Sequence, residues 1–179
     1  MGKEAVVLRY GHRVVRDYRV TSHCCLVARA FGAKKIFIDG AQDESLAKTV
    51  EAVEKRWGKG LDVEFTESWR NTLKTLKEKG YTAIHATMYG LPLQKIEGKI
   101  GRLKKACIII GSQKVEREVY EMADLNVSVT QQPHSEIAAL ALLLDRFFQG
   151  KELGKKFPGA GQKIIPHARG KKVAKLSKK

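Results

Sequence analysis

The chain contains the stretch ACIIIGSQKV at residues 106–115, in which five apolar residues in succession end at Gly111 and lead into a polar loop. A continuous apolar run is typical of a strand that is covered on both faces, as in parallel sheets. Further apolar-rich runs recur along the chain, at Ala5–Leu8, Ile36–Ile38, Val63–Phe65, Ala83–His85 and Asn126–Val129. The repetition predicts a sheet of parallel strands around Ala106–Ile110.

Helical patterns lie between these runs. They cover Thr21–Phe31, Asp43–Trp57, Ser68–Lys79, Val115–Ala123 and Ser135–Gln149, and a glycine follows four of the five. The last pattern is apolar almost all round, which predicts burial on most sides and possible contact with a second subunit. Alternating strands and helices predict an α/β domain over residues 1–150, with helices on both faces of a parallel sheet and a ligand site at the carboxyl ends of the strands.

The composition is strongly basic. Lys and Arg outnumber Asp and Glu by 34 to 19, a formal net charge of +15. Such an excess favours a polyanionic partner such as nucleic acid, and the alternative is a basic protein whose charge only keeps it in solution. One cluster stands between the first strand and the first helix and consists of Arg9, His12, Arg13, Arg16 and Arg19. We expect this segment to be a loop that contacts phosphate, the alternative being a solvated basic loop.

The second basic cluster is the C-terminal tail. Residues 150–179 carry ten Lys or Arg and one acidic residue, Glu152, together with several glycines and prolines. We expect residues 151–179 to form an appendage that buries little. Ile164 and Ile165 could add a strand or dock on a partner subunit. The residues expected to hold a nucleic-acid backbone are Arg9, His12, Arg169, Lys171, Lys172 and Lys175.

Several other kinds of protein are disfavoured. No apolar run approaches the roughly 18 residues of a membrane span, and no secretory signal is visible, so we expect a cytoplasmic protein without a membrane partner. Cys24, Cys25 and Cys107 form neither a disulfide framework nor a C-x-x-C pair, which suggests buried thiols in a reducing compartment. The five histidines have no metal-ligand spacing, so no metal is expected. Trp57 and Trp69 fit core positions, with a base-stacking platform as the alternative.

Three segments follow strands at the expected ligand edge: residues 85–91 (HATMYGL), residues 110–115 (IGSQKV) and residues 129–136 (VTQQPHSE). Each could be an ordinary turn, but together they predict a pocket lined by main-chain groups. The second segment lacks the glycines of a dinucleotide fingerprint and the full pattern of a phosphate-binding P-loop. Ser135 could suggest hydrolysis, but a helix N-cap explains it better.

The segments at residues 8–33, 85–91, 108–127, 131–151 and 166–173 resemble, in order and spacing, the archaeal-type tRNA cytidine-56 2′-O-ribose methyltransferases of the SPOUT superfamily. The resemblance covers nearly the whole chain. It implies a C-terminal trefoil knot within the parallel α/β fold, a homodimer, tRNA as substrate and S-adenosylmethionine as cofactor.

The same resemblance implies which residues contact the cofactor. They are Ala86, Gly111, Ser112, Gln113, Lys114, Val115, Val129, Thr130, Gln131, Gln132, Pro133, His134, Ser135 and Glu136. The chain departs from the family pattern at three places. Ala86 replaces a larger apolar residue, Thr130-Gln131 replaces Gly-Asn, and Glu116 replaces proline.

Catalysis of ribose methylation requires a group that binds the neighbouring phosphate, stabilises the developing alkoxide and helps remove the 2′-hydroxyl proton. The resemblance points to Arg13, Arg16 and Arg19 of the first matching segment, with His23 and Arg9 in reserve. Arginine suits the first two tasks, and His12 or His23 could accept the proton at neutral pH. Two alternatives remain open: a SPOUT methyltransferase that acts on another RNA nucleotide, and a non-catalytic RNA-binding module.

Overall fold

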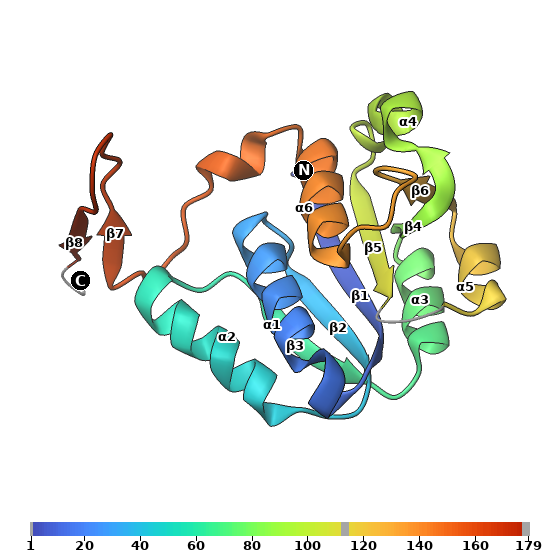
Figure 1. Cartoon of the computed structure of the whole chain (residues 1–179), viewed down its shortest axis with the longest axis horizontal. Coiled ribbons are helices and arrows are strands. Elements are labelled where there is room, and N and C mark those ends of the chain that lie inside the picture. Colours follow the sequence, from blue (N-terminus) through green and yellow to red (C-terminus); the bar gives the residue numbers. More distant parts are fainter. Residues whose placement is uncertain (1, 112–114, 177–179) are drawn as a thin grey trace.

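The computed structural model describes residues 2–111 and 115–176. Six strands form one parallel sheet in the order β3-β2-β1-β5-β4-β6, and a small antiparallel hairpin, β7-β8, stands apart from it (Figure 1). The sheet strands are β1 (Glu4–His12), β2 (Lys35–Gly40), β3 (Asp62–Thr66), β4 (Thr82–Pro92), β5 (Lys105–Gly111) and β6 (Leu125–Ser128). The parallel α/β architecture expected from the apolar runs is confirmed.

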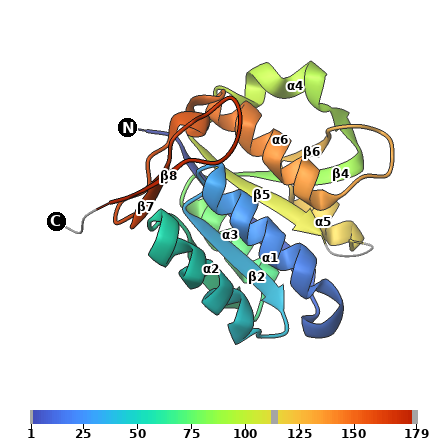
Figure 2. The same ribbon diagram turned by 60° about the vertical axis from the view of Figure 1, so that its left-hand side comes forward.

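The helices are α1 (Val14–Ala30), α2 (Glu44–Trp57), α3 (Trp69–Glu78), α4 (Leu93–Ile100), α5 (Arg117–Met122) and α6 (Glu136–Phe148). They pack on the sheet in two groups, and each group forms its own apolar core. On one face of the sheet, residues of α1, α2, α4 and α6 pack against alternate residues of the strands, such as Val7 and Ile108. On the other face, residues of α3 and α5 pack against Leu8 and Ile109. Helices therefore cover both faces, as expected (Figure 2).

β5 lies in the middle of the sheet because its sequence allows burial on both sides. Every residue from Ala106 to Ile110 is 0% exposed, since successive side chains enter the two cores in turn. The three cysteines, Cys24, Cys25 and Cys107, are buried free thiols, and burial raises the pKa of each to about 12. Trp69 is also buried in the core, whereas Trp57 is only half-buried.

Two boundaries near the N-terminus differ from the expectation. β1 continues to His12 and α1 begins at Val14, so the predicted basic loop between a strand ending at Leu8 and a helix starting at Thr21 is wrong. The early start of α1 is held by Asp17, whose carboxylate accepts hydrogen bonds from the backbone N–H and the guanidinium of Arg13. Asp17 in the first turn also complements the helix dipole. The helix α4 was not expected from the sequence at all.

The tail is anchored more firmly than its composition suggests. After the 3₁₀ turn η1 (Lys151–Gly154), Phe157 packs on Gly58 and Gly60 at the end of α2, where a Cβ on Gly60 would come within 2.5 Å of the ring. The guanidinium of Arg29 lies 4.2 Å from the centre of the Phe157 ring, and the backbone of Lys59 donates to the carbonyl of Pro158. Beyond this anchor the hairpin pairs β7 (Gln162–Ile164) with β8 (Val173–Lys175). The expected extra strand at Ile164 is thus present, paired with the tail itself.

Candidate functional site

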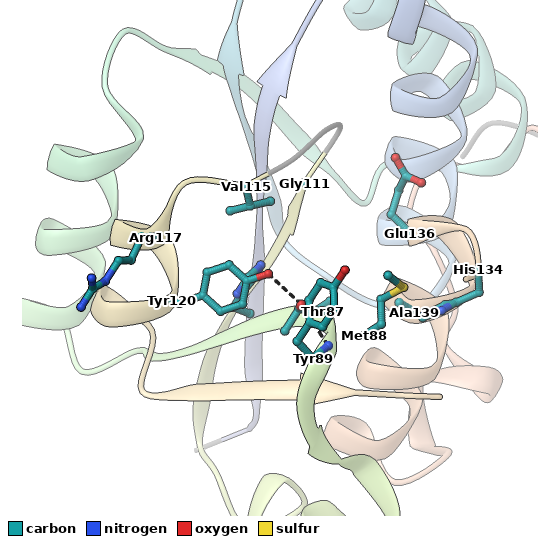
Figure 3. Close-up of a pocket in the computed structure, with 12 residues that line it drawn as sticks. Thr87, Met88, Tyr89, Gly111, Val115, Arg117, Tyr120, His134, Glu136 and Ala139 are labelled. Atoms are coloured by element: carbon teal, nitrogen blue, oxygen red, sulfur yellow. Dashed lines mark hydrogen bonds between the residues drawn. The ribbon is translucent and has the colours of Figure 1, made fainter. Parts of the chain in front are cut away.

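A cavity of about 870 Å³ opens at the carboxyl ends of β4 and β5. Its walls come from these strands and from the beginnings of α5 and α6 (Figure 3). The lining residues are His85, Ala86, Thr87, Met88, Tyr89, Gly111, Val115, Arg117, Tyr120, His134, Glu136 and Ala139. All three segments selected from the sequence contribute to this lining, so their predicted convergence is confirmed.

The β4 wall is a bulge in the strand. Ala86 and Leu91 both pair with Val127 of β6, so residues 87–90 loop out of the ladder towards the cavity. Gly90 permits the return to the sheet, because a Cβ there would lie 2.4 Å from backbone atoms of Asn126 and Val127. We expected the segment 85–91 to be a loop that follows a strand, and this is wrong. The segment is a bulged part of β4 that places Thr87, Met88 and Tyr89 at the cavity.

His85 is the buried residue of this wall. Its side chain is buried, and its Nδ1 lies 2.9 Å from Oδ1 of Asn126. Nδ2 of Asn126 donates to the carbonyl of Tyr120, so the amide oxygen faces the imidazole and Nδ1 must donate to it. Burial lowers the pKa of His85, and the hydrogen bond to Asn126 opposes that shift. His85 is thus neutral at pH 7, with an unprotonated Nε2 that has no hydrogen-bond partner among the described residues.

The wall next to His85 belongs to α5. The ring of Tyr120 stands edge-on to His85, with ring centres 4.6 Å apart. Its hydroxyl lies 3.1 Å from Oγ1 of Thr87, which ties α5 directly to the β4 bulge (Figure 3). Arg117 also lines the cavity, but its side chain points away from Tyr120 and Thr87. The hydroxyl groups of Tyr120 and Thr87 suit a ligand with hydrogen-bonding edges.

The residues that the resemblance implied for the cofactor divide into three groups. Ala86, Gly111, Val115, His134 and Glu136 line the cavity. Ser112, Gln113 and Lys114 lie outside the described residues. The remaining ones occupy the segment before α6 without lining the cavity, namely Val129, Thr130, Gln131, Gln132, Pro133 and Ser135.

Ser135 has a structural role. Its hydroxyl accepts a hydrogen bond of 3.2 Å from the backbone N–H of Ile137, so it caps α6, as the sequence predicted. In the same segment, the imidazole of His134 lies 2.7 Å from the carbonyl of Gln132. These local contacts set the path by which the chain enters α6 and places Glu136 at the cavity.

The candidate catalytic residues lie on α1 or, for Arg13, at its N-cap, outside the cavity lining. Arg16, Arg19 and His23 are exposed and fall three or four residues apart, on one face of the helix. Arg13 is held by Asp17 through two side-chain hydrogen bonds of 2.9 and 3.0 Å. The structure therefore brings the exposed three together but does not bring them to the cavity within one chain.

Arg9 and His12 are not on the surface. Both lie in β1, where Arg9 is 0% and His12 2% exposed. The prediction that they contact RNA directly does not fit this burial, because their charged or polar atoms cannot reach a phosphate. Burial lowers the pKa of His12, with Asp43 acting against the shift and Arg9 adding to it. In contrast, Arg169, Lys171, Lys172 and Lys175 are exposed on the tail.

The sequence reasoning missed Arg117, Tyr120 and Ala139 as parts of the cavity. α5 spans only Arg117–Met122, which is too short for a periodic pattern to reveal which side faces a ligand. Ala139 reads as an ordinary apolar position of α6. None of these three residues carried a local signal, since their place at the cavity depends on how β4, β5 and β6 are arranged.

Comparisons with known proteins identify the family of this chain. Residues 57–174 match the family model described as tRNA ribose 2′-O-methyltransferase, aTrm56. A tRNA (cytidine(56)-2′-O)-methyltransferase of Methanopyrus kandleri is 46% identical over 171 residues, covering 96% of both chains. The enzyme of that name from Pyrococcus horikoshii is 50% identical over 175 residues, covering 96% of this chain and 85% of its own.

Solved structures share the fold at low sequence identity. A TrmH/SpoU tRNA-modifying enzyme of A. aeolicus superposes with a TM-score of 0.63 at 13% identity, covering 85% of this chain and 77% of that one. An AdoMet-bound rRNA methyltransferase of Sinorhizobium meliloti superposes with a TM-score of 0.61 at 17% identity, covering 84% and 57%. With the family match and the near full-length relatives, this chain belongs to the tRNA ribose 2′-O-methyltransferase family aTrm56.

Proposed function

We propose that this chain methylates the ribose 2′-oxygen of cytidine 56 in tRNA and uses S-adenosylmethionine as methyl donor. The activity and target are those named for its near full-length relatives. The observation in the structure that carries the proposal is the single cavity built from the three segments at the carboxyl ends of the strands. The family resemblance assigned the methyl donor to these same segments.

The cavity fits the proposed cofactor. A volume of about 870 Å³ is within the range of pockets for ligands of this size. Ala86, Val115 and Ala139 supply apolar walls for a nucleoside, and Thr87 and Tyr120 supply hydroxyl groups. Among the described residues of the lining, Glu136 is the only carboxylate, and it suits a ligand that carries sulfonium and ammonium charges. When bound, S-adenosylmethionine supplies an electrophilic methyl group.

The protein's own groups then have to deal with the RNA. Arg16 and Arg19 bind the phosphate beside the target ribose and stabilise negative charge on its 2′-oxygen. Arg13 has the same predicted role, from a position fixed by Asp17. His23 is exposed on the same helix as these arginines and is the remaining candidate to accept the 2′-hydroxyl proton. His12 is withdrawn from this role because it is buried.

We also propose a homodimer, in which α1 of one copy faces the cavity of the other. Within one chain the candidate catalytic residues stand outside the cavity, so a second copy is the simplest way to complete the site. Exposed apolar side chains on α1 and α6 support this arrangement: Val14 is 40%, Val15 98% and Leu142 42% exposed. A trefoil knot around β4, β5 and β6 belongs to the same proposal and is supported by the SpoU/TrmH-type neighbours.

The division into a domain of residues 1–150 and a basic appendage of residues 151–179 is kept as a proposal. The exposed cations Arg169, Lys171, Lys172 and Lys175 would hold the tRNA backbone. Because the proposed substrate is tRNA, we place the protein in the cytoplasm. No helix among residues 2–111 and 115–176 is both long and apolar enough to cross a membrane.

Two measurements test the proposal. Calorimetric titration with S-adenosylmethionine should show saturable binding that is lost in Ala86→Trp, which fills the cavity, and kept in Ala52→Trp on the exposed side of α2. Nuclease digestion of the methylated tRNA and mass analysis of its nucleosides should give 2′-O-methylcytidine. A methylated base, or another methylated nucleoside, would favour a related enzyme with a different target. Absence of cofactor binding would favour a non-catalytic RNA-binding module.

A further inference from the structure

The largest fully buried side chain among the described residues is that of Arg9, in the centre of β1. A buried guanidinium is costly unless other polar groups satisfy it, so its contacts reveal what it is there to hold. It does not line the cavity, and the mechanism above gives it no task.

Arg9 joins two helices that begin far apart in the sequence. Its Nη2 lies 3.2 Å from Oε1 of Glu136, the first residue of α6. Its Nε donates to the hydroxyl of Thr21 on α1 over 3.4 Å. One guanidinium therefore connects the wall of the cavity with the helix that carries the candidate catalytic residues.

The contacts continue on the far side of Thr21. Its hydroxyl lies 3.0 Å from Nδ1 of His12, whose Nε2 is 3.7 Å from a carboxylate oxygen of Asp43. Because the hydroxyl accepts from Arg9, it is free to donate to Nδ1 of the neutral imidazole. Asp43 in turn caps α2, accepting from the backbone N–H of Ser45.

We propose that Arg9 is a positioning residue for methyl transfer, which fixes the Glu136 carboxylate at the cavity wall and sets the position of α1 relative to that wall. This inference rests on the proposed function. Glu136 is partly open to solvent, with 27% of its side chain exposed, so without Arg9 its carboxylate could turn away from the ligand. Thr21 lies between Arg19 and His23 on α1, so its hydrogen bond fixes the turn that presents them.

The contacts of Arg9 with Glu136 and with Thr21 can be removed separately by substitution. Glu136→Gln removes the charge at the cavity and should weaken cofactor binding roughly tenfold or more, as expected for a lost charged contact. Thr21→Val keeps the volume of the side chain but removes the hydrogen bond between Arg9 and α1. It should lower kcat with little change in cofactor affinity. Arg9→Met should show both defects. Arg9→Lys, which keeps the charge but not the fork of donors, should recover cofactor affinity better than kcat.

Arg29→Met is the matched control. Arg29 is also a buried arginine, 6% exposed, but its guanidinium donates to backbone carbonyls at the end of α2, which does not line the cavity. It should lose stability as Arg9→Met does while keeping the cofactor affinity and kcat of the wild type, measured well below the unfolding temperature. Equal kinetic constants for Arg9→Met and Arg29→Met would overturn the inference.

Amide hydrogen exchange decides the same question in the free protein, so the inference can be tested even if the proposed function fails. Arg9→Met should speed exchange at the first hydrogen-bonded turns of α6 and in the Arg19–His23 turn of α1, and Arg29→Met should not. Unchanged exchange at both places in Arg9→Met would contradict the inference. Absence of cofactor binding by the wild-type chain would instead contradict the proposed function.

Discussion

The two basic clusters of this chain look alike in sequence and differ in space. Near the N-terminus, Arg9 is sealed in β1, and Arg16 and Arg19 stand in solvent only a few residues later. In the tail, the basic residues from Arg169 to Lys175 are exposed together. Positive charge thus lies both in the core and at the surface in one region and only at the surface in the other, which suits it to two roles, support inside the fold and contact with a polyanion outside it. The exposed fraction of each side chain, which depends on tertiary partners, separates the two roles.

The largest effect is expected from the exposed arginines of α1. Arg16→Ala and Arg19→Ala should each lower the methyl transfer rate about a hundredfold, as loss of a group that stabilises developing charge does elsewhere. Their free energies of unfolding should stay within about 0.5 kcal/mol of the wild type because both side chains are exposed. Single-turnover kinetics and urea unfolding measure the two quantities. Arg56→Ala, at an exposed arginine of α2, is the control, and unchanged rates in both test variants would remove the assigned role.

The tail should affect tRNA binding without affecting the cofactor. Replacing Arg169, Lys171, Lys172 and Lys175 by Gln should weaken tRNA binding about tenfold or more. It should also reduce the slope of log K against log salt by up to about three, since each phosphate contact contributes roughly 0.7–0.9. Filter binding at several salt concentrations measures both. An equal change of charge at exposed Lys95, Lys99, Arg102 and Lys104 is the control. The same slope in the tail variant and the wild type would contradict RNA binding by the tail.

The anchor of the tail should contribute a smaller, structural effect. Phe157→Ala removes the ring that packs on Gly60 and under Arg29, and should lower the free energy of unfolding by about 1–2 kcal/mol, less than for a fully buried Phe. Urea unfolding measures the loss. Ile164→Ala, at a side chain 60% exposed, should change stability by less than about 0.5 kcal/mol. Equal stabilities for these two variants would show that Phe157 does not anchor the tail.

The smallest effect concerns the pH dependence of stability. Burial lowers the pKa of His12 in the folded state, so the unfolded chain takes up a proton more readily. The contribution of buried, neutral His12 to the free energy of unfolding is complete above the unfolded-state pKa of about 6.5. This contribution is lost as the pH falls towards the lowered pKa of the folded state, by at most about 1.4 kcal/mol per pH unit. His85 shifts in the same direction. His12→Asn should therefore flatten, without abolishing, the fall in stability as the pH drops below about 6.5. An unchanged slope would mean that His12 is not buried neutral.

Local patterns predicted what is local in this fold. The apolar runs located all six strands of the sheet, and glycines and caps located five helices to within a few residues, apart from the start of α1. α4 was missed because Leu93–Ile100 is short and contains Gly98. The bulge of β4 was read as a loop, since its return to the sheet depends on Gly90 meeting β6. Arg9 was placed on the surface because nothing near it in sequence indicates Glu136 as its partner.

The most direct test of the account compares two tRNAs that differ only at cytidine 56. One carries the natural ribose and the other a 2′-deoxyribose, and labelled S-adenosylmethionine reports methyl transfer to each. The account predicts one methyl group per molecule on the first tRNA and none on the second, because the second lacks the accepting oxygen. Equal labelling of both tRNAs would place the methyl group elsewhere and contradict the proposed ribose methylation.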